Sequence, residues 1–207
     1  MKLKRIRIRK NEEGADTFSL VGKPAIQITH ICLSEEQPDI IEIMLADKEK
    51  KQIVSPLLIP DKKIYRSAES LNDDEDALIY WSAATIKREQ QNIMKSYVNQ
   101  PIKLDHASET EDAYILECWI KEDDKLDKRD QLYYDAGVIP VGTLLFKLQI
   151  TSDSLWDDIK SGKYNGLSVE GKYSFDEIEA EEEIYADDLE ALVDIITETI
   201  AQIKNIS

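Results

Sequence analysis

The 207-residue sequence has little of the residue types on which several common sites depend. Its two cysteines, Cys32 and Cys118, are too few and too far apart for a disulfide framework or a zinc cluster, which favours a reducing compartment. With two histidines, His30 and His106, any nucleophile that needs an imidazole base must use one of them. There is no phosphate-binding glycine loop and no His-Glu-x-x-His motif. We therefore expect no cofactor and no metal.

Basic residues are in the minority, and long apolar runs are missing. The 26 lysines and arginines against 42 acidic residues give a formal charge of −16, which repels phosphates and anionic membrane surfaces. The basic run 2–10 alternates isoleucine with arginine, which favours an edge strand with a solvated basic face over a nucleic-acid arm. Neither a membrane span nor a signal peptide is indicated. We expect a soluble protein that binds neither nucleic acid nor membrane.

Short segments of alternating apolar and polar residues dominate the first two-thirds of the chain. They predict a mostly antiparallel sheet with strands over 5–9, 17–21, 26–33, 40–45, 52–59, 113–120, 141–150 and 167–175. A helix is expected over 82–97, where Ile86, Ile93, Met94 and Tyr97 share one face. A second, short helix is expected to begin at a cap in 152–154, to carry Leu155, Trp156 and Ile159, and to end at Gly162.

The composition changes after Phe175. Residues 176–188 are strongly acidic, and 189–206 carry a narrow apolar stripe that predicts an amphipathic helix. We therefore divide the chain into a domain, 1–175, and an appendage, 176–207. The terminal helix could fold back on the domain, form a homodimer or dock on a scaffold protein. The acidic runs 73–76 and 181–183 lack the spacing of a calcium loop and are interpreted as solvated surface.

Two residues are candidates for chemistry on position alone. His106 ends a predicted strand, where its side chain could project into a cleft, whereas His30 lies inside an apolar alternating strand. Ser168 stands between Gly166 and Gly171, and glycine permits a close approach of substrate or oxyanion to the backbone. A lone Gly-x-Ser is common, and this one lacks the second glycine of an α/β-hydrolase nucleophile elbow.

The cysteines are weaker candidates for a nucleophile. Cys32 and Cys118 each lie in an apolar predicted strand, where a free cysteine is usually a small buried hydrophobic residue. We therefore prefer Ser168 to either thiol.

A longer run of residues resembles a known family. The segment 147–171 has a strand, a tryptophan-bearing helix that ends in Lys-x-Gly, and then Asn-Gly-Leu-Ser-Val-Glu-Gly. It resembles the nucleophile region of the XkdF-like phage serine proteases, which look like a branch of the prohead, or head-maturation, proteases. Other segments of the chain also resemble the family, so that the resemblance spans roughly 17–175. These segments are 18–25, 57–66, 105–106 with 117–120, and 140–143.

The resemblance implies a fold and a set of site residues. The fold would be α+β, with a mainly antiparallel β-barrel core surrounded by a few helices, as in herpesvirus assemblin. Ser168 would be the nucleophile and His106 its general base. The family's acidic position falls near Thr17, which makes Asp16 the nearest acid. Glu170 is the alternative, because residues i and i+2 of a strand face the same side.

The resemblance also implies a function. The chain would be a head-maturation serine endopeptidase that cleaves scaffold and major capsid protein segments inside the procapsid, in the host cytoplasm. The alternative is a catalytically inactive structural or scaffolding protein of the phage head that retains the protease fold. A hydrolase unrelated to phage is a third possibility.

Overall fold

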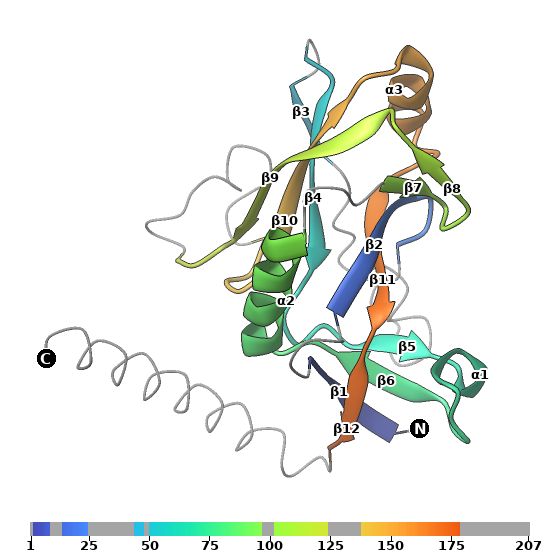
Figure 1. Ribbon diagram of the computed structural model, residues 1–207, viewed down its shortest axis with the longest axis vertical. Coiled ribbons are helices and arrows are strands. Elements are labelled where there is room, and N and C mark those ends of the chain that lie inside the picture. Colours follow the sequence, from blue (N-terminus) through green and yellow to red (C-terminus); the bar gives the residue numbers. More distant parts are fainter. Residues whose placement is uncertain are drawn as a thin grey trace, which may run out of the picture.

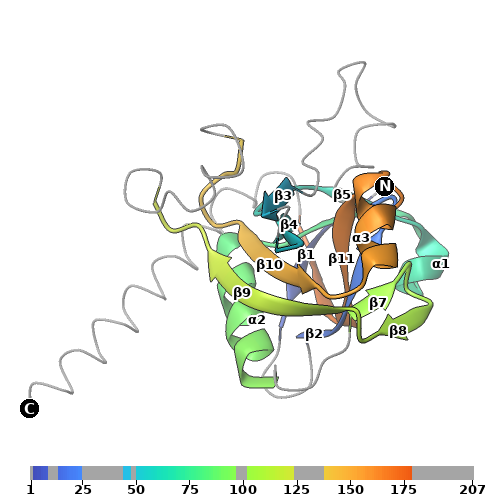
Figure 2. The same ribbon diagram turned by 90° about the horizontal axis from the view of Figure 1, so that it is seen from above.

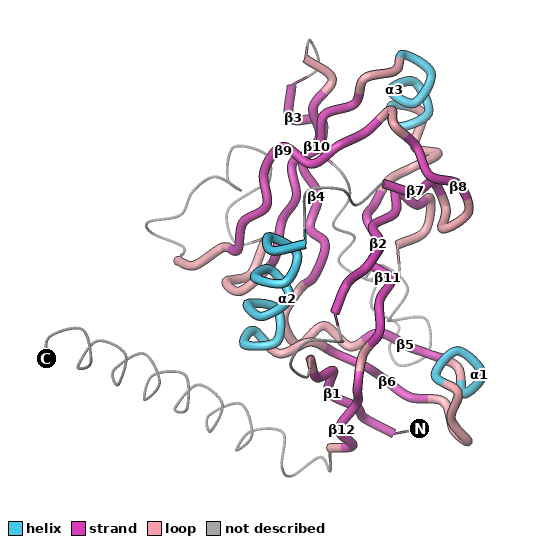
Figure 3. The backbone as a smooth tube through the Cα atoms, in the orientation of Figure 1, coloured by secondary structure: helices cyan, strands magenta, loops and turns pink. Residues whose placement is uncertain are grey.

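The computed structural model describes residues 2–8, 14–24, 44–47, 50–96, 102–123 and 138–178, and strands take up more of this backbone than helices do (Figure 3). The strands are β1 (Lys2–Arg7), β2 (Gly14–Val21), β3 (Met44–Asp47), β4 (Gln52–Leu58), β5 (Ile64–Arg66), β6 (Ala77–Tyr80), β7 (Ile102–Leu104), β8 (Ser108–Thr110), β9 (Ala113–Ile120), β10 (Leu144–Ile150), β11 (Gly166–Lys172) and β12 (Ser174–Glu177). The helices are α1 (Ala68–Leu71), α2 (Ala83–Ser96) and α3 (Asp153–Lys160).

The strands form three four-stranded sheets, in the orders β12-β1-β6-β5, β3-β4-β10-β9 and β11-β2-β7-β8 (Figure 1). The predicted β-barrel core is wrong, because none of the three sheets closes on itself. A barrel requires every strand to be hydrogen-bonded on both sides. Each of these sheets instead keeps two edge strands within the described residues, and β11, the edge nearest β4, contacts β4 without pairing with it.

One apolar core lies between the sheets and takes side chains from all three. Phe18 of β2 meets Phe146 of β10 edge-to-face, with ring centroids 5.0 Å apart. Most of β10 is buried because it is a central strand, paired with β4 on one side and β9 on the other. Figure 2 shows β9 and β10 side by side, with α2 packed next to them.

The helices predicted over 82–97 and after the cap in 152–154 are confirmed in their main features. In α3, the Ser152 side chain accepts a hydrogen bond from the Leu155 backbone N–H at 3.1 Å, and Leu155, Trp156 and Ile159 are buried. Helix α2 buries Ile86 and Ile93, but Met94 is 54% exposed, so its predicted place on the buried face is wrong. No helix of the described part of the chain is long and apolar enough to span a membrane.

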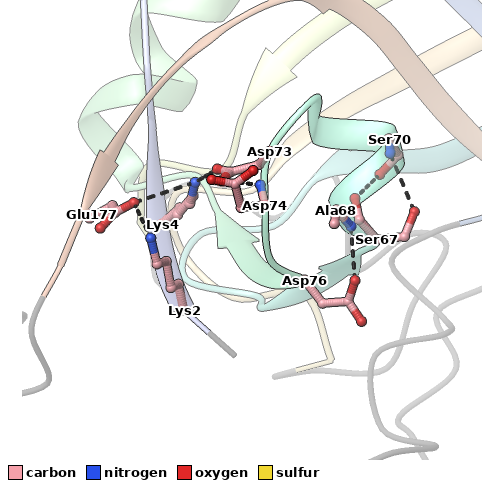
Figure 4. Close-up of polar contacts among 9 residues, drawn as sticks. All are labelled: Lys2, Lys4, Ser67, Ala68, Ser70, Asp73, Asp74, Asp76 and Glu177. Carbon is pink, nitrogen blue, oxygen red and sulfur yellow. Dashed lines mark hydrogen bonds and ion pairs between the residues drawn. The ribbon is translucent and has the colours of Figure 1, made fainter.

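Strand β1 was expected to be an edge strand with a solvated basic face, and this is wrong. It pairs with β12 on one side and with β6 on the other. Lys4 is only 5% exposed and its ammonium contacts the carboxylates of Asp73 and Glu177 (Figure 4). Lys2, Lys4 and Arg7 of this strand therefore have acidic partners, and the run 73–76 supplies one of them.

Strand β11 continues into β12 with a single residue, Tyr173, between them. Because β11 pairs with β2 and β12 pairs with β1, this length of chain crosses from one sheet to another (Figure 1). The crossing places residues of both sheets around one cleft. Three predictions lie outside the described residues: the strand that carries His30 and Cys32, the solvated acidic run 181–183, and the C-terminal helix with its possible dimer contact.

Candidate active site

Ser168 lies in the middle of β11, directly opposite Ser19 of β2 in an antiparallel register. Paired residues point to the same face of a sheet, and so does Glu170, two residues further along β11. Ser19 is completely buried, whereas Ser168 is partly exposed and lines a cleft. Of the two hydroxyls, Ser168 is therefore the one that a substrate can reach.

The glycines on either side of Ser168, Gly166 and Gly171, lie too close to neighbouring residues of the same chain for a side chain to fit. A Cβ added at Gly166 would lie 2.2 Å from Pro24, and one added at Gly171 would lie 2.2 Å from the carbonyl oxygen of Gly14. Both distances are far below a van der Waals contact. The sequence predicted a close approach of substrate or oxyanion; the close approach in the structure is made by Pro24 and Gly14, which lie at or just beyond the two ends of β2.

His106 lies in the tight turn between β7 and β8. Asp105 and His106 both have left-handed backbone angles, with φ of 46° and 61°, and the Ala107 N–H donates to the Leu104 carbonyl at 2.9 Å. These are the features of a type I′ turn, and Asp and His are among the residues that tolerate left-handed angles. The local sequence Asp-His therefore favours the turn that carries the imidazole.

The turn is attached to the end of β2. The Asp105 N–H donates to the Leu20 carbonyl at 2.9 Å, and the Gly22 N–H donates to Asp105 Oδ1 at 3.2 Å. These bonds hold the His106 backbone over the face of the sheet that carries Ser19, Ser168 and Glu170.

The imidazole of His106 contacts two side chains through one nitrogen. Its Nδ1 lies 2.9 Å from Glu170 Oε1 and 3.2 Å from Ser19 Oγ. A hydrogen on Nδ1 that is donated to the carboxylate leaves Nε2 free to accept a proton. This is the tautomer that a serine protease base requires. Lys103 lies 3.6 Å from the other carboxylate oxygen of Glu170.

The structure brings some of the predicted site residues together and not others. Ser168, His106 and Glu170 line the same cleft. Within the described residues no hydrogen bond joins Ser168 to His106; such bonds are often long without substrate and tighten when it binds. Asp16 is exposed and makes no contact with His106 in this part of the chain. Glu170 is thus the acid that lies against the histidine.

The cleft has a volume of about 450 Å³ and is bounded by apolar and basic side chains. Its walls are formed by Ile6, Lys23, Arg66, Ser70, Leu71, Ile79, Trp81, His106, Ser168, Val169, Glu170, Gly171, Tyr173 and Phe175. A smaller recess of about 20 Å³ adjoins it between β4 and β11. Arg66, Trp81, Ser168 and Val169 line both spaces.

Cys118 is a poor nucleophile in this structure. It is a free thiol on β9, and burial raises its pKa to about 12, so it is protonated at neutral pH. Within the described residues, no three His, Cys, Asp or Glu side chains are grouped so as to hold a metal ion.

Two side chains of this site were not identified from the sequence. Ser19 is a hydroxyl in the buried strand β2, between Phe18 and Leu20, and this polar residue in an apolar run was a usable signal. Arg66 ends the block 57–66 that carries part of the family resemblance, but its place beside Ser168 depends on a long-range contact that no local pattern reveals.

Comparison with known proteins identifies a family. The model of the family described as "Putative phage serine protease XkdF" matches residues 42–177, which is more than half of the chain and includes His106, Ser168 and Glu170. Neither the curated proteins nor the solved structures contain a match. The predicted resemblance is confirmed over this range, and the chain belongs to the phage serine protease family XkdF.

Proposed function

We propose that this protein is the serine endopeptidase of phage head maturation, with Ser168 as nucleophile, His106 as general base and Glu170 as the acid that orients the base. The observation that carries the proposal is the contact of His106 Nδ1 with Glu170 at the wall of the cleft that Ser168 lines. Membership of a phage serine protease family supports it.

The mechanism follows from these three side chains. His106 Nε2 accepts the proton of the Ser168 hydroxyl as its oxygen attacks a peptide carbonyl, and a tetrahedral intermediate forms. The carboxylate of Glu170 stabilises the imidazolium. The imidazolium then gives its proton to the leaving amine, and the peptide bond breaks. Water attacks the acyl-enzyme by the same route and regenerates Ser168.

The natural substrates in this proposal are scaffold and major capsid protein segments inside the procapsid, in the host cytoplasm. The test is co-expression of the full chain with the capsid and scaffold proteins of its phage. We expect these proteins to be shortened by the wild type and to stay intact with Ser168→Ala. Ser154→Ala, on the exposed side of α3, is the matched control and should process them normally. Full processing by Ser168→Ala would overturn the assignment.

The second candidate is a structural head protein that keeps the fold without activity. The lack of a hydrogen bond between Ser168 and His106 in the described residues favours it. A fluorophosphonate probe separates the two candidates, because it reacts with an activated serine and needs no natural substrate. Labelling of Ser168 in concentrated protein supports the protease; an unlabelled, correctly folded and assembled protein supports the structural role.

A further inference from the structure

Arg66 is a charged side chain with an unusual position. It is the last residue of β5, an edge strand, and it lines both the cleft and the adjoining recess together with Ser168. Its Nη1 donates to the backbone carbonyl of Tyr65 at 3.0 Å. A guanidinium has five N–H donors, so this bond leaves most of its capacity unused.

The guanidinium has no carboxylate partner among the described residues. Burial disfavours its charged form and lowers the pKa of Arg66 from its ordinary value. A partly desolvated charge without a partner is costly, and proteins usually provide an opposite charge. This chain has 42 acidic residues for 26 basic ones, so acidic partners are abundant in the sequence. An arginine that has no acidic partner in the described part of the chain and lines the same cleft as the proposed nucleophile therefore indicates a ligand.

The rest of the cleft is also short of negative charge. Lys23 is a second cation on its wall, and among the described residues that line the cleft Glu170 is the one acid. The carboxylate of Glu170 is already engaged by His106, with Lys103 nearby. The cleft is thus locally basic on a protein with a formal charge of −16. Such a field attracts an acidic peptide to the cleft while the rest of the surface repels it.

We propose that the cleft selects peptide segments with a glutamate or aspartate side chain next to the bond to be cleaved, and that Arg66 binds this carboxylate. A guanidinium can hold a carboxylate by two parallel hydrogen bonds, which gives orientation as well as affinity. The apolar side chains of Trp81 and Val169 line the same recess as Arg66 and reduce the access of water to such a pair. This inference rests on the proposed protease function, because it describes the substrate of the same site.

The first test is a cleavage profile of the full-length protein on a proteome-derived peptide library, read by mass spectrometry. We expect Glu or Asp to be enriched within two positions of the cut. Arg66→Gln should lower kcat/KM at least tenfold on a cleaved acidic peptide and less than threefold on its Glu→Gln counterpart. Arg88→Gln on α2 makes the same charge change away from the cleft and should behave as the wild type. Thermal unfolding of each variant checks the fold.

The second test does not require activity. Ser168→Ala is titrated into a fluorescein-labelled peptide of alternating Leu and Glu, and into the same peptide with Gln, at about 0.1 M salt, where surface charges are largely screened. We expect at least tenfold tighter binding of the Glu peptide, and loss of this difference in Ser168→Ala with Arg66→Gln. Equal binding of both peptides would overturn the inference, whether or not the protein is a protease.

Fluorophosphonate labelling separates the failure of this inference from that of the proposed function. If the protein labels at Ser168 but shows no acidic preference, the substrate class is wrong and the protease assignment stands. If Arg66→Gln slows labelling and lowers cleavage of acidic and neutral peptides equally, Arg66 acts on the reacting carbonyl and the specificity role is wrong. If the wild type neither cleaves nor labels, the function fails, and the binding test still decides the role of Arg66.

Discussion

Lys4 and Arg66 belong to the same four-stranded sheet and lie in opposite electrostatic surroundings. Lys4 is on the central strand β1, where its ammonium contacts the carboxylates of Asp73 and Glu177 (Figure 4). Arg66 is on the edge strand β5, faces the cleft and has no carboxylate partner among the described residues. We call the part of the fold outside the cleft the frame. The charge of Lys4 in the frame is paired within the protein, whereas the charge of Arg66 in the cleft is available to a ligand. Substitutions in the frame should change stability, and substitutions in the cleft should change activity.

The largest effect is expected at Ser168. Ser168→Ala should lower the rate of peptide cleavage by roughly 10⁵- to 10⁶-fold, because it removes the nucleophile, while the free energy of unfolding stays within about 0.5 kcal/mol. Cleavage of a fluorogenic peptide and urea unfolding measure the two quantities. A large loss of stability would place Ser168 in the frame and contradict the comparison.

A smaller loss of activity is expected at Glu170. Glu170→Gln should lower kcat by roughly 10²- to 10⁴-fold, because an amide cannot hold the imidazole in the required tautomer or stabilise the imidazolium. Asp16→Asn makes the same chemical change at an exposed position and should leave kcat within about twofold. Initial rates at saturating peptide test the pair. The reverse result would make Asp16 the third catalytic residue.

In the frame, the largest change in stability is expected at Glu89. It is completely buried on α2, accepts a hydrogen bond from the Ala15 N–H at 2.5 Å, and has its pKa raised by burial to about 7. Since this is above the ordinary value of 4.5, Glu89 stabilises the fold fully below about pH 4.5, and that contribution is lost as pH rises through 7. The lost contribution above pH 7 is about 3 kcal/mol.

Glu89→Gln should remove this pH dependence. We expect it to raise the free energy of unfolding by about 2–3 kcal/mol at pH 8 and to change it little at pH 4.5, because Gln resembles the neutral acid. Urea unfolding of the variant and the wild type across this range measures the difference. A difference that does not vary with pH would show that burial does not raise the pKa of Glu89 above its ordinary value.

The smallest effects are expected when Lys4 and Arg66 are each replaced and the changes in the free energy of unfolding are compared. Lys4→Met should lower the free energy of unfolding by about 2 kcal/mol, because it leaves the acidic partners of a buried ammonium unpaired. Arg66→Met should change it by less than about 0.5 kcal/mol or raise it, since it removes a partly desolvated charge that has no acidic partner in the described chain. Urea unfolding at neutral pH compares them. Equal destabilisation by both would remove the distinction between frame and cleft.

The local features of this fold could be predicted from the sequence. The Ser152 cap and the apolar spacing of Leu155, Trp156 and Ile159 predict α3, since a helix is specified by residues close in sequence. Alternation within β11 placed Ser168 and Glu170 on one face for the same reason. The pairing of sheet edges is not local, and so the sequence could not show that the three sheets stay open. The edge position predicted for β1 failed in the same way, because β6 and β12 are distant in sequence.

The candidate site was predictable in its main residues and not in its surroundings. The scarcity of histidine and the family resemblance indicated His106 and Ser168, and strand periodicity offered Glu170 as an alternative acid. No local pattern indicated that the Asp105–His106 turn is hydrogen-bonded to the end of β2. The sequence also could not show that Arg66 lies partly buried on the wall of the cleft that Ser168 lines, with no acidic partner among the described residues, because burial and pairing are properties of the packed structure.

The most direct test of the central claim is fluorophosphonate labelling of the full-length protein, with the modified residue located by mass spectrometry. We expect an adduct on Ser168, none in Ser168→Ala, and labelling slowed by at least about 100-fold in His106→Ala, because the hydroxyl then has no base. An adduct on Ser19, which also contacts His106, or cleavage by a protein that never labels at Ser168 would contradict it.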